Sequence, residues 1–194
     1  MKKILILLLK IIGALFIVGV IGVFAIIIKY RLELPNIQSM VEDYKPQMAT
    51  TIYDKNNKVV DTLSVEAREV VKLEDVSPYI KDAFLSIEDK QFYSHHGLNF
   101  KGIARAVITT FLKGRATQGG SSITQQLAKN AFLTPEKTFS RKVKEAILTY
   151  QIERTYTKDE ILERYLNEIY YGSGSYGIKN AAEQYFKKDV KDLN

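Results

Sequence analysis

The chain contains no cysteine, which excludes disulfide bonds, thiolate nucleophiles and cysteine-bound metals from its chemistry. Only two histidines occur, and they are neighbours, His95 and His96. Adjacent histidines with no third one elsewhere make a poor metal site, so no metal centre is expected. The chemistry must therefore come from carboxylates, amides, hydroxyls and basic side chains.

Positive charge is only slightly in excess once the N-terminal lysines are set aside. The formal net charge is +6, but Lys2, Lys3 and Lys10 lie before or inside the first apolar run. Without these three of its 28 basic residues, the chain has 25 against 22 acidic residues, a net of +3. A nucleic-acid-binding surface is weakly supported, and no nucleic-acid partner is expected.

A long apolar stretch dominates the N-terminus. Ile11 to Ile28 carries no charge and follows the apolar run Ile4 to Leu9, which is enough for a helix to cross a bilayer core. A cleaved signal peptide is the alternative, but its apolar part is usually about 7 to 15 residues and ends at a small-x-small site. Lys29, Tyr30 and Arg31 follow the run directly, which favours an uncleaved anchor.

The basic residues before this anchor indicate its orientation. Lys2, Lys3 and Lys10 have no acidic neighbours, which places the N-terminus in the cytoplasm, although Lys29 and Arg31 weaken the asymmetry. We therefore predict a single-pass membrane protein. Residues 1–10 form the cytoplasmic tail and the start of the anchor, residues 11–28 form the transmembrane helix, and the rest lies outside.

The remaining residues predict a connector, one small β element and a helical domain. Leu34 to Met48 has two prolines and no clear period, and TTIYDKNNKVVDTL has the alternation of a short hairpin about Asn56 and Asn57. Residues 29–75 are thus read as a connector with a hairpin, and residues 76–194 as one domain.

Capping residues and apolar spacing predict the helices of this domain. The expected helices run from Ser77 and Pro78, over 100–113, from 119–122, from near Ser140, from Thr157 (with Glu160 in a capping box) to Gly172, and over 178–186.

Glu88 is the first candidate for acid–base chemistry. It lies four residues after Phe84 and four before Phe92, at the edge of the apolar helical stripe expected from Ile80, Ala83, Phe84 and Ile87. Partial burial there would raise its pKa and make it a usable general base or acid near neutral pH. The alternative is an ordinary surface glutamate at a helix end.

Glu145 is the second candidate. It shares a helix face with Leu148 and Ile152, on a helix that is apolar nearly all round and should be buried. A buried carboxylate needs a partner, and Arg141, one turn earlier, is the nearest. A purely structural Arg–Glu pair is the alternative.

The segment GGSSITQQLAKN predicts an anion site at a helix start. Two glycines let the backbone approach a ligand, and the first turn of a helix supplies free amide donors. Gln125 and Gln126 add side-chain amides, and Lys129 adds a positive charge one turn on. Phosphate or pyrophosphate is the natural ligand, and an ordinary capped helix is the alternative.

Five segments resemble, in the same order, the motifs of glycosyltransferase family 51. They are EDKQFYSHHGLNF, GGSSITQQLAKN, RKVKE, KDEILERYLNEIYYG and GIKNAAEQYF. That family occurs in class A penicillin-binding proteins and monofunctional peptidoglycan glycosyltransferases, and the resemblance covers about residues 76–194. It implies a mainly α fold: a lysozyme-like helical lobe with a small membrane-contacting jaw, for which AVITTFL (106–112) is suited. The family domain usually continues with further helices, so we expect a domain truncated at its C-terminus. Neither Ser-x-x-Lys nor Lys-Thr-Gly, the transpeptidase signatures, occurs here.

The resemblance implies that the protein polymerises lipid II into β-1,4-linked glycan strands at the outer face of the bacterial cytoplasmic membrane, with inversion and release of undecaprenyl pyrophosphate. Glu88 would be the general base and Glu145 would assist on the leaving-group side. No cofactor is required, and a divalent cation, Mg²⁺ or Mn²⁺, would serve only as a pyrophosphate counterion. The implied partners are lipid II, the growing glycan chain, membrane lipid and other cell-wall synthesis proteins. Matching positions in the donor cleft are Arg105, Ser121, Gln125, Gln126, Lys129, Arg141 and Lys142.

Two residues depart from the family pattern. Asn99 stands where the first motif usually has Asp, and Ser122 where the second usually has Thr. Serine keeps the hydroxyl. Asparagine removes a charge, which puts any metal-binding or salt-bridge role of that position in doubt.

Two other functions compete with a transferase. A lysozyme-like hydrolase could also use one glutamate on a helical lobe, but it needs no pyrophosphate site, and the cluster of Lys129, Arg141 and Lys142 favours the transferase. A non-catalytic membrane scaffold would be indicated by loss of either glutamate. Both Glu88 and Glu145 are present.

Overall fold

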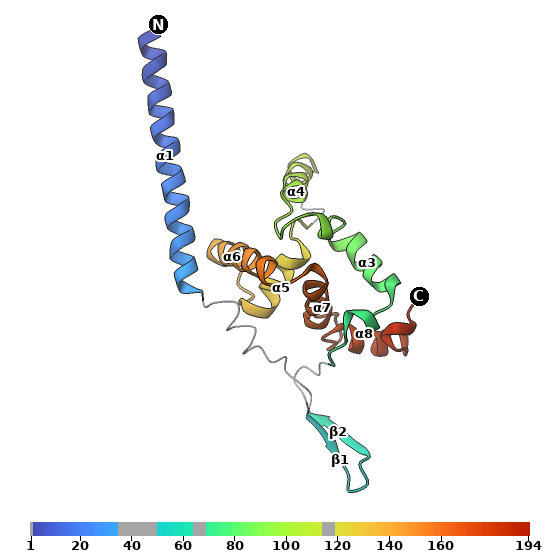
Figure 1. Cartoon of the computed structure of the whole chain (residues 1–194). Coiled ribbons are helices and arrows are strands. Elements are labelled where there is room, and N and C mark those ends of the chain that lie inside the picture. The colour runs from blue at the N-terminus through green and yellow to red at the C-terminus, as the bar shows by residue number, and fades with distance from the viewer. Residues whose placement is uncertain (1, 35–49, 64–68, 114–118) are drawn as a thin grey trace.

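The structure is a computed structural model that describes residues 2–34, 50–63, 69–113 and 119–194 (Figure 1). The described part is mainly helical, as the sequence predicts. Its elements are α1 (Lys2–Glu33), β1 (Thr50–Tyr53), β2 (Val59–Leu63), η1 (Leu73–Asp75), α3 (Pro78–Glu88), η2 (Phe92–Ser94), α4 (Phe100–Lys113), α5 (Ile123–Phe132), α6 (Phe139–Thr155), α7 (Lys158–Glu168), α8 (Ile178–Phe186) and η3 (Val190–Asp192).

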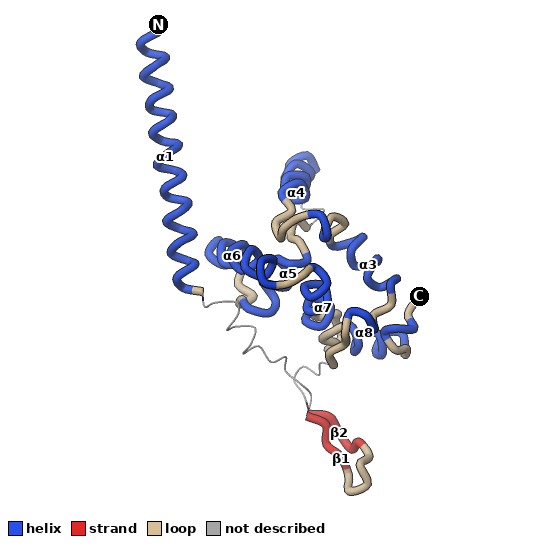
Figure 2. Tube along the Cα trace, in the orientation of Figure 1, coloured by secondary structure: helices blue, strands red, loops and turns tan. Residues whose placement is uncertain are grey.

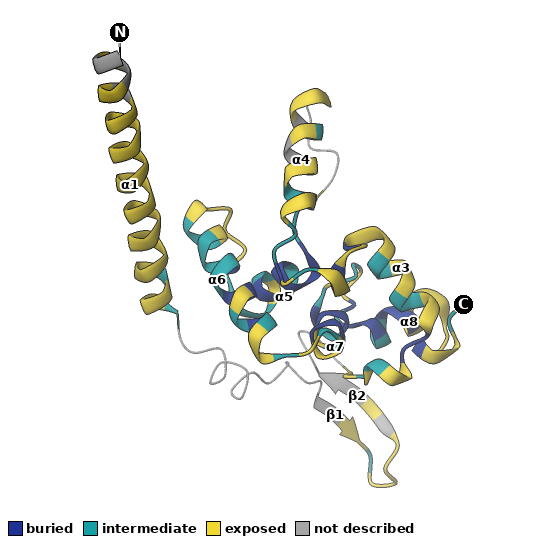
Figure 3. Cartoon of the chain, turned by 45° about the horizontal axis from the view of Figure 1, so that its top comes forward, coloured by how far each residue is buried: buried dark blue, intermediate teal, exposed yellow. Residues whose placement is uncertain are grey.

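Helix α1 is the predicted N-terminal apolar helix. It begins at Lys2 and ends at Glu33, so it extends past both ends of the predicted span. Its segment Leu9–Glu33 is long and apolar enough to cross a membrane, and its most apolar window is not buried by the rest of the chain. Figures 1 and 3 show the helix standing away from the helical body.

Strands β1 and β2 pair antiparallel (Figure 2). Asp54 organises the turn between them, because its Oδ1 accepts the backbone N–H groups of Asn56 at 2.8 Å and Lys58 at 2.9 Å. Asn57 has a φ of 60°, a left-handed conformation that asparagine tolerates. The predicted connector, residues 34–48, lies outside the described residues except for Leu34.

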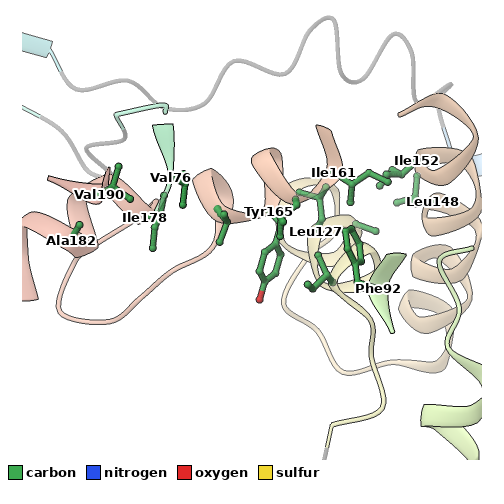
Figure 4. Packing of buried hydrophobic residues seen from close by; sticks show 14 residues of the cluster. Val76, Phe92, Leu127, Leu148, Ile152, Ile161, Tyr165, Ile178, Ala182 and Val190 are labelled. Atoms are coloured by element: carbon green, nitrogen blue, oxygen red, sulfur yellow. The ribbon is translucent and has the colours of Figure 1, made fainter. Parts of the chain in front are cut away.

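The core lies where α5 packs against both α6 and α7 (Figure 4). Leu148 and Ile152 from α6 are fully buried, and Phe92 from η2 is buried with them. Burying a side chain of this kind contributes roughly 1.5–3 kcal/mol. The other buried apolar residues of this cluster are Val76, Ile123, Leu127, Ala128, Ile161, Leu162, Tyr165, Leu166, Ile178, Ala182 and Val190.

Side-chain caps define the helix starts that position the site. Ser122 caps α5 and Thr157 caps α7, each in a capping box, so the box predicted at Thr157 and Glu160 is confirmed. Helix α7 ends at Glu168 and not at Gly172, because Ile169 is extended and Tyr170 pairs with Tyr176 in an isolated β-bridge. The predicted end of this helix was wrong.

Helix α3 differs from its prediction on two points. Ser77 precedes it but makes no side-chain cap, because its hydroxyl donates to the carbonyl of Leu193. Of the expected apolar stripe, Ile80 and Phe84 pack against the core, whereas Ile87 is 79% exposed. The core-facing stripe therefore ends one turn before the C-terminus of α3.

Candidate active site

Two cavities of about 790 and 640 Å³ adjoin Glu88, Gln126 and Lys129, which line both. The larger one has an aromatic wall from α3, α7 and the loop after α7, and it also includes Arg141. The smaller one extends to the GGSS segment and α4, and includes Arg105 and Ser121. The aromatic wall consists of Phe84, Tyr165, Tyr170, Tyr171 and Tyr176.

Glu145 is buried, with only 2% of its side chain exposed. Its carboxylate receives Arg141 Nη1 at 2.8 Å, Gln125 Nε2 at 3.2 Å and the ammonium group of Lys142. Burying a charge is tolerated where charged partners and hydrogen bonds surround it, and here two cations and an amide do so. The predicted Arg141–Glu145 pair is confirmed.

Lys142 connects this buried cluster to the surface. Its Nζ also donates to Ser121 Oγ at 3.0 Å, so the lysine joins the start of α6 to the GGSS segment. About half of its side chain is exposed, whereas the Arg141 side chain is 17% exposed. Of these two cations, Lys142 is therefore the more exposed to solvent, and its ammonium group is paired with the buried carboxylate of Glu145.

Glu88 is exposed, so the expectation of partial burial was wrong. It is the last residue of α3, where the helix has already turned away from the core, and Ile87 beside it faces solvent as well. Gln126 Nε2 donates to Glu88 Oε2 at 2.7 Å and orients the carboxylate. A carboxylate in this position is open to an incoming hydroxyl.

Tyr165 lies behind Gln126 and Glu88. Burial raises its pKa, and the negative charge of Glu88 raises the pKa further, so the phenol stays protonated. Its hydroxyl donates to Gln126 Oε1 at 3.5 Å. This long contact favours the orientation of the Gln126 amide in which its NH2 group faces Glu88, and no sequence pattern predicts it.

The first turn of α5 does not offer the free amides predicted for an anion. The N–H of Ser122 donates to Gln125 Oε1, that of Gln125 to Ser122 Oγ, and that of Ile123 to Asp89 Oδ2 at 3.2 Å. The expectation of free backbone donors was wrong at these three positions, because side chains satisfy them. Attraction for an anion comes instead from the side chains of Lys129, Arg141 and Lys142.

Asn99, one of the two departures from the family pattern, has a local structural role. Its Oδ1 accepts the N–H of Gly102 at 2.7 Å, which is the geometry of an N-cap on α4. Its Nδ2 lies 3.5 Å from Asp89 Oδ1, and Asp89 also pairs with His95 Nε2 at 2.8 Å. Because Asn99 is uncharged, it places no second negative charge beside Asp89.

No group of three His, Cys, Asp or Glu side chains suited to a metal ion occurs in residues 2–34, 50–63, 69–113 and 119–194. His95, which might have served as a ligand, is bonded to Asp89. The counterion role of a divalent cation stays a prediction.

Comparison with known proteins identifies the family of the chain. Residues 56–194 match the family model described as transglycosylase. The chain is 44% identical over 180 residues to penicillin-binding protein 1A of Neisseria flavescens, covering 93% of this chain and 22% of that one. It is 49% identical over 145 residues to penicillin-binding protein 1F of Bacillus subtilis (strain 168), covering 75% and 20%. Against penicillin-binding protein 1A of Aquifex aeolicus (strain VF5) it is 42% identical over 194 residues, covering 100% and 26%.

The chain belongs to the transglycosylase family. It is homologous to penicillin-binding proteins 1A and spans roughly a quarter of the length of these relatives.

Proposed function

We propose that the protein polymerises lipid II into β-1,4-linked glycan strands, with inversion at the anomeric carbon and release of undecaprenyl pyrophosphate. The observation that supports this most is the contrast between its two carboxylates. Glu88 is exposed at the junction of two cavities, whereas Glu145 is buried beneath Arg141 and Lys142. One suits proton transfer and the other suits the organisation of positive charge.

In this mechanism Glu88 takes the proton of the acceptor's 4-hydroxyl while that oxygen attacks the anomeric carbon of the donor. The bond from this carbon to the diphosphate breaks, and the diphosphate leaves with the electron pair. An exposed carboxylate held by Gln126 can meet the hydroxyl directly. Direct displacement converts an α-linked donor into a β-linked product.

Glu145 acts through its neighbours on the leaving-group side. It holds Arg141 and Lys142 in place before the reaction, so their charge needs no reorganisation as the diphosphate departs. Preorganised cations stabilise the developing negative charge more than they stabilise the ground state. Lys129, Ser121 and Arg105 complete the donor site, and a divalent cation is at most an additional counterion.

In our proposal this chemistry takes place at a membrane, which the following features of the helices support. Helices α5, α6 and α7 form the lysozyme-like lobe, and α4 forms the jaw. Phe111 and Leu112 near the end of α4 are 88% and 75% exposed, which suits insertion among lipids. In Figures 1 and 3, α1 and α4 project from the same side of the body. In our proposal α1 crosses the membrane with its N-terminus in the cytoplasm, and the catalytic domain lies outside.

The rival functions each lack support in the site. A hydrolase of glycan strands would need water at the anomeric carbon but no cluster such as Arg141, Lys142 and Lys129. A scaffold would need no base at the junction of two cavities. Lipid II, the growing strand and membrane lipid are the proposed partners, and other cell-wall synthesis proteins could join them.

The deciding experiment incubates the detergent-solubilised chain with labelled lipid II, separates the product on a gel and digests it with a muramidase. We expect a muramidase-sensitive ladder that disappears in Glu88→Gln, while that variant still binds a donor analogue. Glu74→Gln, an exposed glutamate in η1, is the matched control and should leave the ladder unchanged. Wild-type rates in Glu88→Gln would remove Glu88 from the mechanism.

A further inference from the structure

An apolar groove of about 590 Å³ lies between the anchor helix α1 and α6. Figures 1 and 3 show the lower end of α1 beside α6. The walls are largely aliphatic on both sides, and the lining also includes the cations Arg31 and Lys142. The aliphatic walls are formed by Val23, Ile26 and Ile27 of α1 and by Val143, Ala146 and Ile147 of α6.

Helix α6 has two apolar faces, and the core covers only one of them. Leu148 and Ile152 are buried, whereas Tyr150 on the other face is 58% exposed. On α1, Ile27 is 39% exposed and its neighbour Ile28 is 55% exposed, so Ile27 is the residue turned toward α6. The outward face of α6 therefore meets the anchor across a space that protein atoms do not fill.

Lys142 belongs to both this groove and the candidate active site. The same side chain lines the groove, pairs with Glu145 and donates to Ser121. Arg31 adds a second positive charge at the end of the anchor. An apolar groove whose lining includes Lys142 of the active site matches a molecule with an anionic head and a long hydrocarbon tail.

The walls of the groove are fixed to each other at one end. Lys144 Nζ lies 2.9 Å from Glu33 Oε2, and 5.5 Å from the centre of the Tyr30 ring. An ion pair joined to a cation–π contact holds the end of α1 against α6. The groove is thus a defined feature of how the two helices pack.

We propose that this groove binds the polyprenyl chain of the diphosphate-linked donor, with the diphosphate beside Lys142. The inference rests on the proposed function, and it adds a tail-binding site formed jointly by the anchor and α6. Because Lys142 is shared, one molecule places its head in the catalytic cleft and its tail in the groove. Close packing of the tail against the aliphatic walls of both helices then adds to the affinity for the donor. A phospholipid acyl chain is the competing occupant.

The first test needs no turnover. The full chain in detergent is exposed to a photoreactive polyprenyl phosphate, and the cross-linked peptides are identified by mass spectrometry. We expect cross-links on residues 23–31 and 143–150 that unlabelled polyprenyl diphosphate removes and phosphatidylglycerol does not. Removal only by phosphatidylglycerol, or no cross-link in these segments, would overturn the proposal.

The second test separates the tail from the head. Ile27→Trp fills the groove from the anchor side, far from Glu88, and Ile28→Trp is the matched control on the adjacent, more exposed position. With a long-chain donor, Ile27→Trp should raise KM about tenfold, because the indole occupies the space that the tail would fill and removes its packing contacts. With a short-chain donor both variants should match the wild type.

The outcomes distinguish the two proposals. If the wild type polymerises the long-chain donor but Ile27→Trp and Ile28→Trp behave alike, the tail site is wrong and the transferase stands. If the wild type forms no ladder with either donor, the proposed function fails, and the cross-linking result alone decides whether the groove binds a polyprenyl chain.

Discussion

Gln125 and Gln126 are consecutive residues of α5 whose side chains bind the two different glutamates of the site. Gln125 Nε2 donates to buried Glu145 at 3.2 Å, and Gln126 Nε2 donates to exposed Glu88 at 2.7 Å. Consecutive helical residues point about 100° apart, so one helix turn can serve both carboxylates. The separation of the two acidic groups is therefore set by the backbone of α5.

This arrangement predicts opposite consequences for the two glutamines. Gln126→Ala should lower kcat about tenfold with little loss of stability, because Gln126 is half-buried and orients Glu88. Gln125→Ala should destabilise the fold by roughly 2 kcal/mol, because it removes part of a capping box and a buried hydrogen bond. Polymerisation kinetics and denaturant unfolding of both variants check the contrast. Equal stability losses would contradict it.

Substitutions of the two cations beside Glu145 should also differ in their effects. Arg141→Met removes a mostly buried partner and should cost roughly 2–3 kcal/mol of unfolding free energy. Lys142→Met should cost less than about 1 kcal/mol, because this side chain is half exposed and solvent screens its pairing. Its main effect should be weaker binding of a donor analogue, measured by titration. An unchanged affinity would remove Lys142 from the donor site.

The capping box of α7 predicts a pH dependence of stability. The backbone N–H of Thr157 donates to the Glu160 carboxylate and holds its pKa below the ordinary 4.5, with the Thr157 hydroxyl adding to the effect. A carboxyl whose pKa is lowered on folding contributes stability above its ordinary pKa, and loses that contribution as the pH falls through the folded value. The stability difference between wild type and Glu160→Gln should be constant above about pH 5 and shrink below it. Glu183→Gln, an exposed carboxylate on α8, is the control for unfolding curves at each pH.

The contact between anchor and domain can be tested by charge reversal. Glu33→Lys or Lys144→Glu alone should loosen α1 from α6, and the double reversal should restore the contact. Because the chain has no cysteine, spin labels can be attached to single cysteines introduced at positions 32 and 137 without competing thiols. The distance between the two labels then reports how closely the end of α1 lies to the segment before α6. Broad distance distributions in the single variants and a narrow one in the double variant are expected. Identical distributions in all variants would show that the ion pair does not position the anchor.

Local patterns in the sequence predicted the elements well. Helix α4 covers residues 100–113 as expected, Thr157 and Glu160 form their capping box, and Arg141 pairs with Glu145 one turn later. Each of these depends on residues three or four apart, where geometry follows from the helix alone. The order of the motifs was enough to identify the family.

Features that depend on tertiary packing were beyond such patterns. The exposure of Glu88 follows from where α3 leaves the core, and the backbone N–H of Ile123 is occupied because Asp89, 34 residues earlier in the chain, packs against the start of α5. No sequence pattern predicted a role for Tyr165, yet its hydroxyl reaches Gln126 in the site. Only the folded chain brings these groups together.

Asp89, Gly97 and the start of α5 form a closed set of contacts with consequences for motion. Asp89 accepts the N–H of Ile123, and the hydroxyl of Ser122 donates to the carbonyl of Gly97. Gly97 also sits so close to α6 that a Cβ atom there would come within 2.7 Å of Thr149 Cγ2. These segments should then open as one cooperative unit, with their amide protons sharing a common free energy of opening. Glu88 directly precedes Asp89, so its position would be lost when this unit opens and restored when the unit closes.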